Sequence, residues 1–452
     1  MKCSRLPQGH FALSCLPAVA ENQPTNKNRM TTELSNFAAR LREAIQGRDA
    51  ALRRPVGAAR QPCQEPEFDP LALELFALQF KHNAAYRKIC EARNLTPEVV
   101  EHWTQIPSVP TSAFKELALT CLAPGERTTV FHSSGTTEQK PSRHFHSAES
   151  LAVYEASLWA WFRFHLFADK LKLELQPSAA PAGVQASACG CGDEDFRLVV
   201  LTPPPAHAPH SSLVHMFETV RQKLGGASVP ASRAEFLGEI AADGSWTLDF
   251  HGTIQKLKAA CDQATPVTLL GTAFSFVHLL DYLAERNLRF DLPAGSRVME
   301  TGGYKNRSRM LPKAELHALI AKKLGVPSSQ IVCEYGMSEL SSQAYDLGAL
   351  ASRRRVFPSA TKELAGETPA LPESIVRHFC FPPWARAQII SPETGREVAD
   401  GETGLIRVFD LANVFSVMAI QTQDLGIHHG QGFELIGRAA LGEPRGCSLM
   451  AV

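Results

Sequence analysis

The sequence predicts an α/β protein organised around a largely parallel sheet. Short runs rich in β-branched residues alternate with amphipathic stretches of helical spacing, and glycine lies at the end of three of these runs. Alternation of strand, loop and helix is typical of α/β domains with parallel strands. After about residue 381 the chain changes to short strands and turns, which predicts an additional small β subdomain.

Composition bounds the size and the partners of the chain. Its 452 residues suffice for two or three compact units, and a hydrophobic content of 44% supports a sizeable core. Lys plus Arg and Asp plus Glu both number 46, so the chain lacks the basic excess typical of proteins that bind nucleic acid or anionic membranes. No apolar run approaches the roughly 20 residues of a membrane span. The odd number of cysteines, eleven, and their scattered positions indicate free thiols in a reducing cytoplasm.

We expect three parts. Residues 1–64 are expected to be a partly disordered leader with one helix, residues 65–379 an α/β core, and residues 380–452 a small β subdomain with a tail. The apolar stretch Phe11–Ala20 superficially resembles a signal peptide, but it is short and interrupted. We interpret residues 1–29 as an unstructured leader. The Ala-, Gly-, Pro- and Ser-rich composition of segment 176–195 indicates a flexible insertion. Metal binding by Cys189 and Cys191 is the alternative, and it is disfavoured because no second pair lies at metal-ligand spacing.

Apolar residues at helical spacing predict the helices in order along the chain. Cap and first-turn chemistry at Asp69-Pro70 marks the start of the second one, whose apolar spacing continues to Ile89. The expected helices are Thr32–Gln46, Asp69–Ile89, Glu149–Phe167, Leu213–Leu224, Phe276–Arg286 and Lys313–Lys323. Two aromatic and Leu-rich stretches, Trp159–Phe167 and Phe274–Leu283, are expected to be core rather than the walls of a ligand tunnel.

The strands of the parallel sheet are expected where β-branched residues cluster before a turn. These runs are Phe196–Leu201, Val267–Leu270, Arg297–Met299 and Ile331–Cys333. Loops at the carboxyl ends of such strands are where open α/β sheets bind ligands. The strands of the small β subdomain are expected at Ala387–Ile390, Leu405–Phe409 and Val414–Ile420, and Ile106–Thr111 is expected to be extended.

The stretch Val130–Ser142 is the first candidate site. Its apolar start resembles the end of a buried strand, and a cluster of hydroxyls around one glycine follows, then a lysine: Ser133, Ser134, Gly135, Thr136, Thr137 and Lys140. Hydroxyls, backbone N–H groups and a cation can hold a polyphosphate. The spacing differs from the G-x-x-x-x-G-K-[ST] loop of P-loop proteins. An ordinary Ser/Thr/Gly turn remains the alternative.

Two further turns carry candidate residues. Glu339 follows a buried strand in the stretch Tyr335–Glu339, and a carboxylate there suits Mg²⁺, although a glutamate facing a helix dipole would look the same. Gly302 and Gly303 follow another strand. They form either a plain tight turn or a wall where backbone closely approaches a ligand.

Three stretches together resemble the adenylate-forming enzymes, which include the acyl-CoA ligases and the adenylation domains of peptide synthetases. They are S-S-G-T-T at Ser133–Thr137, Y-G-M-S-E at Tyr335–Glu339, and T-Q-D-L-G at Thr422–Gly426 followed by Gly437-Arg438. The resemblance implies ATP and Mg²⁺ as cofactors. The first stretch is then the phosphate loop, and the second, with Gly336 and Ser338, places Tyr335 against adenine and Glu339 at Mg²⁺. Asp424 and Arg438 would hold the ribose hydroxyls, the alternative being a plain surface ion pair.

A narrower resemblance is to the acyl-protein synthetases of bacterial bioluminescence operons, the long-chain-fatty-acid–luciferin-component ligases. It is carried by Ile106–Glu116, Pro209–Leu213, Met299–Tyr304 and Gly437–Leu449, and it covers roughly residues 65 to 450. It implies that a fatty acid is activated as acyl-AMP. The acyl group then passes to a cysteine near the C-terminus, and from there to a partner acyl reductase.

Cys447 is the cysteine to which that role is assigned. It lies beside Gly446 and two residues after Arg445, so a flexible tail could bring the thiol to a site. A nearby guanidinium lowers a thiol pKa from its ordinary value near about 8.5. A cysteine without a task is the alternative.

Departures from the family patterns keep two other functions open. Glu138 stands where the phosphate loop usually has a second glycine, and Lys140 precedes Pro141 instead of following it, which leaves the phosphate role of Lys140 open. The chain stops about a dozen residues after Arg438, so the C-terminal lid domain of acyl-CoA ligases is expected to be missing. The alternatives are an aryl- or acyl-CoA ligase resembling phenylacetate-CoA ligase, and a non-catalytic homologue that binds nucleotide.

Overall fold

A computed structural model describes residues 26–52, 68–133, 140–167, 197–225, 234–242, 244–302, 309–347, 377–430 and 432–439. The expected leader, the insertion at 176–195 and the C-terminal tail lie largely or wholly outside these ranges. None of the helices in them is long and apolar enough to cross a membrane.

One sheet forms the centre of the described chain, in the order β13-β14-β15-β16-β12-β11-β10-β9-β8-β4-β5. Its parallel half consists of β5 (Ala234–Phe236), β4 (Arg197–Val200), β8 (Val267–Thr272), β9 (Arg297–Thr301) and β10 (Ile331–Tyr335). The four predicted parallel strands are therefore confirmed, and the pairs β4–β8, β8–β9 and β9–β10 run side by side.

The other half of the sheet is antiparallel and hydrogen-bonds to the parallel half through β10 and β11. It consists of β11 (Ala344–Leu347), β12 (His378–Cys380), β16 (Gly432–Arg438), β15 (Ala419–His429), β14 (Thr403–Asp410) and β13 (Ala385–Ile390). The expected extended segment contains β1 (Val109–Pro110), which pairs with β15 in parallel. Two separate hairpins are β2 (Thr129–His132) with β3 (Arg143–His146), and β6 (Gly238–Ile240) with β7 (Trp246–Leu248).

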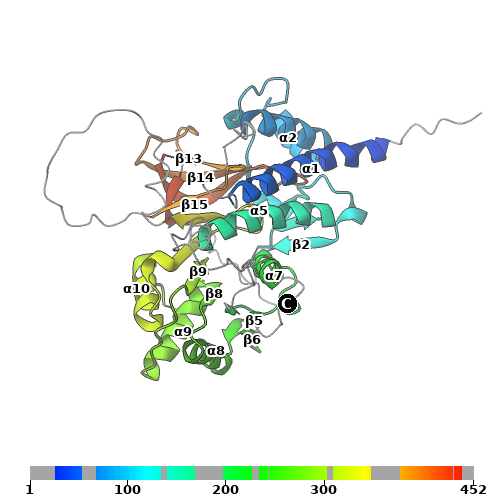
Figure 1. Cartoon of the computed structure of the whole chain (residues 1–452). Helices are drawn as coiled ribbons and strands as arrows, with labels where there is room; N and C mark the ends of the chain where they lie inside the picture. The colour runs from blue at the N-terminus through cyan, green and yellow to red at the C-terminus, as the bar shows by residue number, and fades with distance from the viewer. Residues whose placement is uncertain are drawn as a thin grey trace, which may run out of the picture.

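Helices pack on this sheet in two groups (Figure 1). The helices α8 (Phe250–Asp262), α9 (Ala273–Glu285) and α10 (Lys313–Leu324) share a core with the parallel strands. A second core contains side chains of α1 (Asn26–Leu52), α2 (Phe68–His82), α3 (Ala84–Ala92), α5 (Ala148–Leu166) and α7 (Ser212–Gly225), and of the antiparallel strands. Short helical turns are α4 (Ala113–Glu116), η1 (Trp103–Gln105), η2 (Pro124–Glu126) and η4 (Ser328–Gln330).

The predicted helices are largely confirmed, with one correction. The expected single helix Asp69–Ile89 is two helices, because Asn83 interrupts it. The side chain of this buried asparagine accepts a hydrogen bond from the Tyr86 N–H at 3.1 Å and so caps α3. The helix α1 is longer than expected and includes residues 26–31, part of which had been assigned to the leader. The helix α8 was not predicted. The aromatic stretches of α5 and α9 are core, as expected.

The predicted strand Val414–Ile420 is wrong over most of its length. Residues 414–418 form a buried turn, and β15 begins only at Ala419. Gln79 of α2 hydrogen-bonds both ends of this turn. Its side-chain amide donates to the Asn413 carbonyl at 2.8 Å and accepts from the Met418 N–H at 3.0 Å. The apolar run therefore fills the core from a loop whose polar backbone is satisfied by a buried side chain.

Candidate active site

The hydroxyl-rich stretch connects the two strands of the β2–β3 hairpin. Ser133 and Ser142 face each other at its neck: the Ser142 N–H donates to Ser133 Oγ at 3.0 Å, and the Ser133 N–H donates to the Ser142 carbonyl at 3.3 Å. Of the six predicted loop residues, Ser134, Gly135, Thr136 and Thr137 lie outside the described residues. Lys140 is exposed and forms an ion pair with Glu116 at 3.1 Å.

Glu339 lies directly against this neck. The Ser142 hydroxyl donates to Glu339 Oε1 at 2.6 Å, and the Ser338 hydroxyl donates to Oε2 at 3.1 Å. The Glu339 residue is only 5% exposed, and Ser142 and Ser338 are buried as well. Each carboxylate oxygen thus accepts one hydroxyl hydrogen bond and keeps a second lone-pair direction for another partner. The structure therefore brings together Ser133, Ser338 and Glu339.

His144, which was not among the residues predicted from the sequence, hydrogen-bonds the turn after β10 that carries Ser338 and Glu339. His144 of β3 is buried, and its Nδ1 lies 2.8 Å from the Ser338 carbonyl oxygen, which can only accept. Nδ1 therefore carries the proton. Burial lowers the pKa of His144 to about 4, although the bond to Ser338 opposes the shift. Burial also lowers the pKa of His146, whose ring centroid lies 4.3 Å from that of His144.

These neutral imidazoles predict an acid-labile fold. In the unfolded chain His144 binds a proton near pH 6.5, whereas in the folded chain it does so only near pH 4. Below pH 6.5 the unfolded state binds more protons, so the free energy of unfolding falls as the pH is lowered, by about 2 to 3 kcal/mol at pH about 4.5. Urea unfolding of wild type and His144→Asn across this range measures it. Asn keeps a donor near Nδ1 but does not titrate, so its profile should be flatter; parallel profiles would contradict the assignment.

Two polar side chains, Asp410 and Asn413, hydrogen-bond the turn that follows β10. Asp410, fully buried, accepts hydrogen bonds from the Ser341 and Ser342 N–H groups, both at 2.8 Å, from the Ser342 hydroxyl at 2.7 Å and from the Ala412 N–H at 3.0 Å. Asn413 donates to the Glu339 carbonyl at 2.9 Å. The backbone of the Glu339 turn is thereby fixed on both sides. Nothing in the local sequence pattern indicates these two partners.

The predicted adenosine residues lie at the end of β10 and in the middle of β15. The Tyr335 hydroxyl donates to Asp424 Oδ2 at 2.7 Å, and both residues are buried. Asp424 is the registered partner of Arg438 across β15 and β16, and the Arg438 guanidinium donates to Gln423 at 2.5 Å. The structure therefore brings these three together. The burial of Asp424 argues against a plain surface ion pair.

Gly302 and Gly336 follow neighbouring parallel strands. Gly302 has φ +78°, a conformation that favours glycine, and Gly303 lies outside the described residues. A Cβ atom on Gly336 would lie 2.2 Å from Glu334 Oε1, so this position has no room for a side chain as the structure stands. The Glu334 carboxylate is buried and hydrogen-bonded to the Thr301 hydroxyl. Glu334 therefore links the two strand ends that present these glycines.

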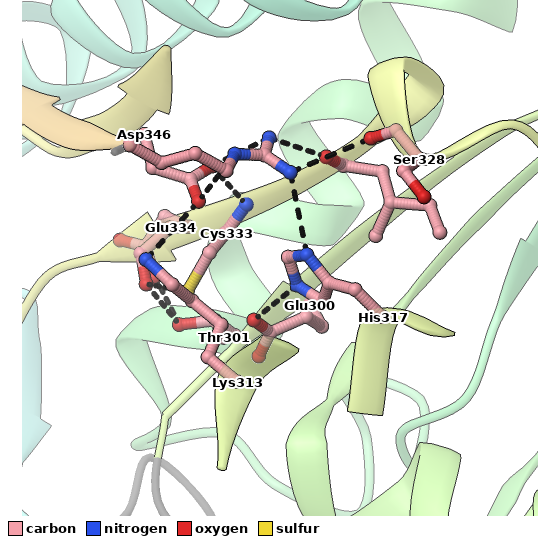
Figure 2. A network of polar contacts seen from close by, with 10 residues as sticks. Glu300, Thr301, Lys313, His317, Ser328, Cys333, Glu334 and Asp346 are labelled. Atoms are coloured by element: carbon pink, nitrogen blue, oxygen red, sulfur yellow. Dashed lines mark hydrogen bonds and ion pairs between the residues drawn. The ribbon is translucent and has the colours of Figure 1, made fainter. Parts of the chain in front are cut away.

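A buried polar network supports the strand ends from the α10 side (Figure 2). His317 of α10 lies 3.1 Å from Glu300 of β9, and Lys313 lies 3.3 Å from Asp346 of β11. The Cys333 N–H of β10 donates to Asp346 at 2.6 Å. The network ends beside Thr301 and Glu334, as the close-up shows, and it connects three strands to one helix. Paired in this way, the buried charges avoid most of the cost of isolated ones.

The donor set at the neck fits a hard cation. Among the described residues no group of three or more His, Cys, Asp or Glu side chains could hold a metal ion. Mg²⁺ does not need such a cage, because it keeps several waters and is commonly held by one or two carboxylates and substrate phosphates. Glu339, with its two hydroxyl partners, supplies one carboxylate beside the hydroxyl-rich loop.

The comparisons with known proteins agree with the resemblance predicted from the sequence. The sequence profile of the family described as "Acyl-protein synthetase, LuxE" matches residues 166–368. The long-chain-fatty-acid–luciferin-component ligase of Aliivibrio fischeri is 22% identical over 396 residues, 84% of this chain and 86% of the relative. That of Vibrio harveyi is 22% identical over 382 residues, 83% of this chain and 84% of the relative. The predicted resemblance is confirmed.

Solved structures show the same fold. An open conformation of 2-hydroxyisobutyryl-CoA ligase with 2-HIB-AMP and CoA has a TM-score of 0.53 at 14% identity, covering 85% of this chain and 79% of that one. The ligase in its thioesterification state has a TM-score of 0.50 at 13% identity, covering 87% and 68%. The fold is therefore that of the adenylate-forming ligases, as predicted, and with the family match it supports an ATP-dependent ligase.

Proposed function

We propose that this chain, a relative of the acyl-protein synthetases, activates a carboxylic acid with ATP to an acyl-adenylate and transfers the acyl group to a protein thiol. A long-chain fatty acid is the proposed substrate, since the relatives from Aliivibrio fischeri and Vibrio harveyi are named for one. The acyl thioester would then serve a partner acyl reductase in the cytoplasm.

One observation carries the adenylation step: Glu339 is held at the neck of the hydroxyl-rich loop by Ser142, 2.6 Å away. The proposed metal carboxylate would thus lie where the loop begins and ends. Tyr335, four residues before Glu339 along the chain, hydrogen-bonds Asp424, and the pair offers an aromatic ring and a carboxylate for adenosine. Phosphate, metal and nucleoside functions would therefore meet at the carboxyl end of β10, the usual ligand edge of an α/β sheet.

The chemistry follows from this arrangement. The substrate carboxylate oxygen attacks the α-phosphorus of ATP, and the bond from that phosphorus to the pyrophosphate oxygen breaks. Bound Mg²⁺ would neutralise charge on the departing pyrophosphate. Ser133, Ser134, Thr136 and Thr137, with the backbone at Gly135, would donate hydrogen bonds to the phosphates. The protein's contribution is mainly positioning and electrostatic stabilisation.

The thiol step is assigned to Cys447. Its sulfur attacks the acyl carbonyl carbon, AMP leaves and the thiol proton passes to solvent. Among the described cysteines, Cys90, Cys121 and Cys333 are buried, and burial raises their pKa values, to about 11 for Cys90 and about 12 for Cys121. Such thiols are poor nucleophiles. Burial therefore disfavours these three cysteines as the nucleophile, and the assignment to Cys447 rests on the resemblance to the acyl-protein synthetases.

Labelling with radioactive fatty acid and ATP tests this step. Wild type should acquire a label that survives a denaturing gel and is released by neutral hydroxylamine. Cys447→Ser should lose the label and still exchange pyrophosphate, because adenylation does not need the thiol. Cys261→Ser, a change at a partly exposed cysteine, is the matched control and should label normally. Undiminished labelling of Cys447→Ser would exclude Cys447 as the acceptor, and acyl transfer to free CoA alone would exclude the protein thioester and favour a CoA ligase.

A further inference from the structure

The backbone of Ser142 and its hydroxyl group have different hydrogen-bond partners and therefore different structural roles. Its backbone N–H and carbonyl close the loop neck against Ser133, at 3.0 and 3.3 Å. Its hydroxyl has a different partner, Glu339 Oε1, at 2.6 Å. A Ser142→Ala change therefore removes the contact with Glu339 and leaves both backbone hydrogen bonds of the neck in place.

The hydroxyl contact has the geometry of a strong, charge-assisted hydrogen bond. A distance of 2.6 Å is typical of O–H···O⁻ pairs. Ser142 is 1% exposed and Glu339 5%, so water does not compete well for either partner. Ser338 contacts the other carboxylate oxygen at the longer distance of 3.1 Å. Ser142 is thus the stronger of the two groups that set the carboxylate plane.

We propose that Ser142 is a positioning residue that orients the Glu339 carboxylate for Mg²⁺ and couples the metal site to the neck of the hydroxyl-rich loop. The proposal rests on the proposed function, since it needs Glu339 to bind the metal. Outer partners that hydrogen-bond a ligating carboxylate typically contribute 10- to 100-fold to metal affinity. The coupling is direct, because the residue that holds the carboxylate is also the last residue of the neck.

Nucleotide binding as a function of Mg²⁺ tests the proposal without turnover. Calorimetry with α,β-methylene-ATP, which cannot be cleaved between the α- and β-phosphates, gives the Mg²⁺ concentration for half-maximal affinity. Ser142→Ala should raise this concentration about 10- to 100-fold. Ser416→Ala is the matched control: Ser416 is equally buried, at 1% exposed, and its hydroxyl donates to the Leu119 carbonyl and not to Glu339. It should leave the Mg²⁺ dependence unchanged.

A double-mutant cycle separates positioning from general damage. If Ser142 acts through Glu339, adding Ser142→Ala to Glu339→Gln should cause no further change in Mg²⁺ dependence. An additive effect, or a Ser142→Ala variant with the wild-type Mg²⁺ dependence, would overturn the proposal and leave the proposed function intact. Wild-type protein that binds the nucleotide analogue without any dependence on Mg²⁺, or does not bind it, would contradict the proposed function and this inference together.

Discussion

Replacing Glu339 by Gln should reduce carboxylate-dependent adenylation by roughly 10²-fold or more, as expected for the loss of a strong electrostatic contact in a transition state. The substitution keeps the size and removes the charge that Mg²⁺ needs. The fold should tolerate it, because the Ser142 and Ser338 hydroxyls that donate to the carboxylate can also accept from an amide. The rate of ATP–pyrophosphate exchange at saturating acid measures the effect.

Glu155→Gln is the matched control for this result. Glu155 is a partly exposed carboxylate that pairs with His215 at 3.2 Å and not with Ser142 or Ser338. Its substitution removes a charge of the same sign and should leave the exchange rate within a few-fold of wild type. A Glu339→Gln variant with an exchange rate in that range would remove Glu339 from the mechanism.

Asp410→Ala should cause the largest loss of stability, roughly 4 kcal/mol or more in the free energy of unfolding. The change strips three buried backbone N–H groups, at Ser341, Ser342 and Ala412, of their acceptor. Each buried donor left unsatisfied costs about 1–3 kcal/mol. Burial raises the pKa of Asp410, and the four hydrogen bonds oppose that shift. Urea unfolding at neutral pH measures the loss.

The matched variant is Asp410→Asn. Its amide oxygen can still accept from Ser341 and Ser342, while its NH₂ group would face the Ala412 N–H, so an intermediate loss is expected. Asp410 supports the turn that carries Glu339. Adenylation by the surviving folded protein should therefore be lower in Asp410→Asn than in wild type, and lowest in Asp410→Ala. Unfolding free energies of all three proteins within about 1 kcal/mol of one another would show that the turn does not depend on this carboxylate.

The parallel half of the sheet could be predicted because each of its strands is a continuous buried run followed by a turn. The antiparallel half could be predicted only in part. The apolar run of residues 414–418 has the composition of a strand, yet its place in a turn depends on Gln79, more than 330 residues away along the chain. Likewise Asn83 breaks a helix by a cap that apolar spacing does not reveal.

The candidate site, like the sheet, could be predicted only in part. Tyr335, Glu339, Asp424 and the hydroxyl cluster were visible as residue types at recognisable spacing. Ser142 belongs to the candidate stretch Val130–Ser142, but its partner Glu339 lies 197 residues further along the chain. The roles of His144 and Asp410 likewise depend on tertiary contacts with the Glu339 turn.

The most direct test of the central claim is ATP–pyrophosphate exchange, measured with purified protein over a chain-length series of carboxylic acids. We expect exchange that requires both Mg²⁺ and an acid, and that is strongest with long-chain fatty acids. Nucleotide binding without exchange for any acid would contradict it, and would identify the chain as a nucleotide-binding homologue without this activity.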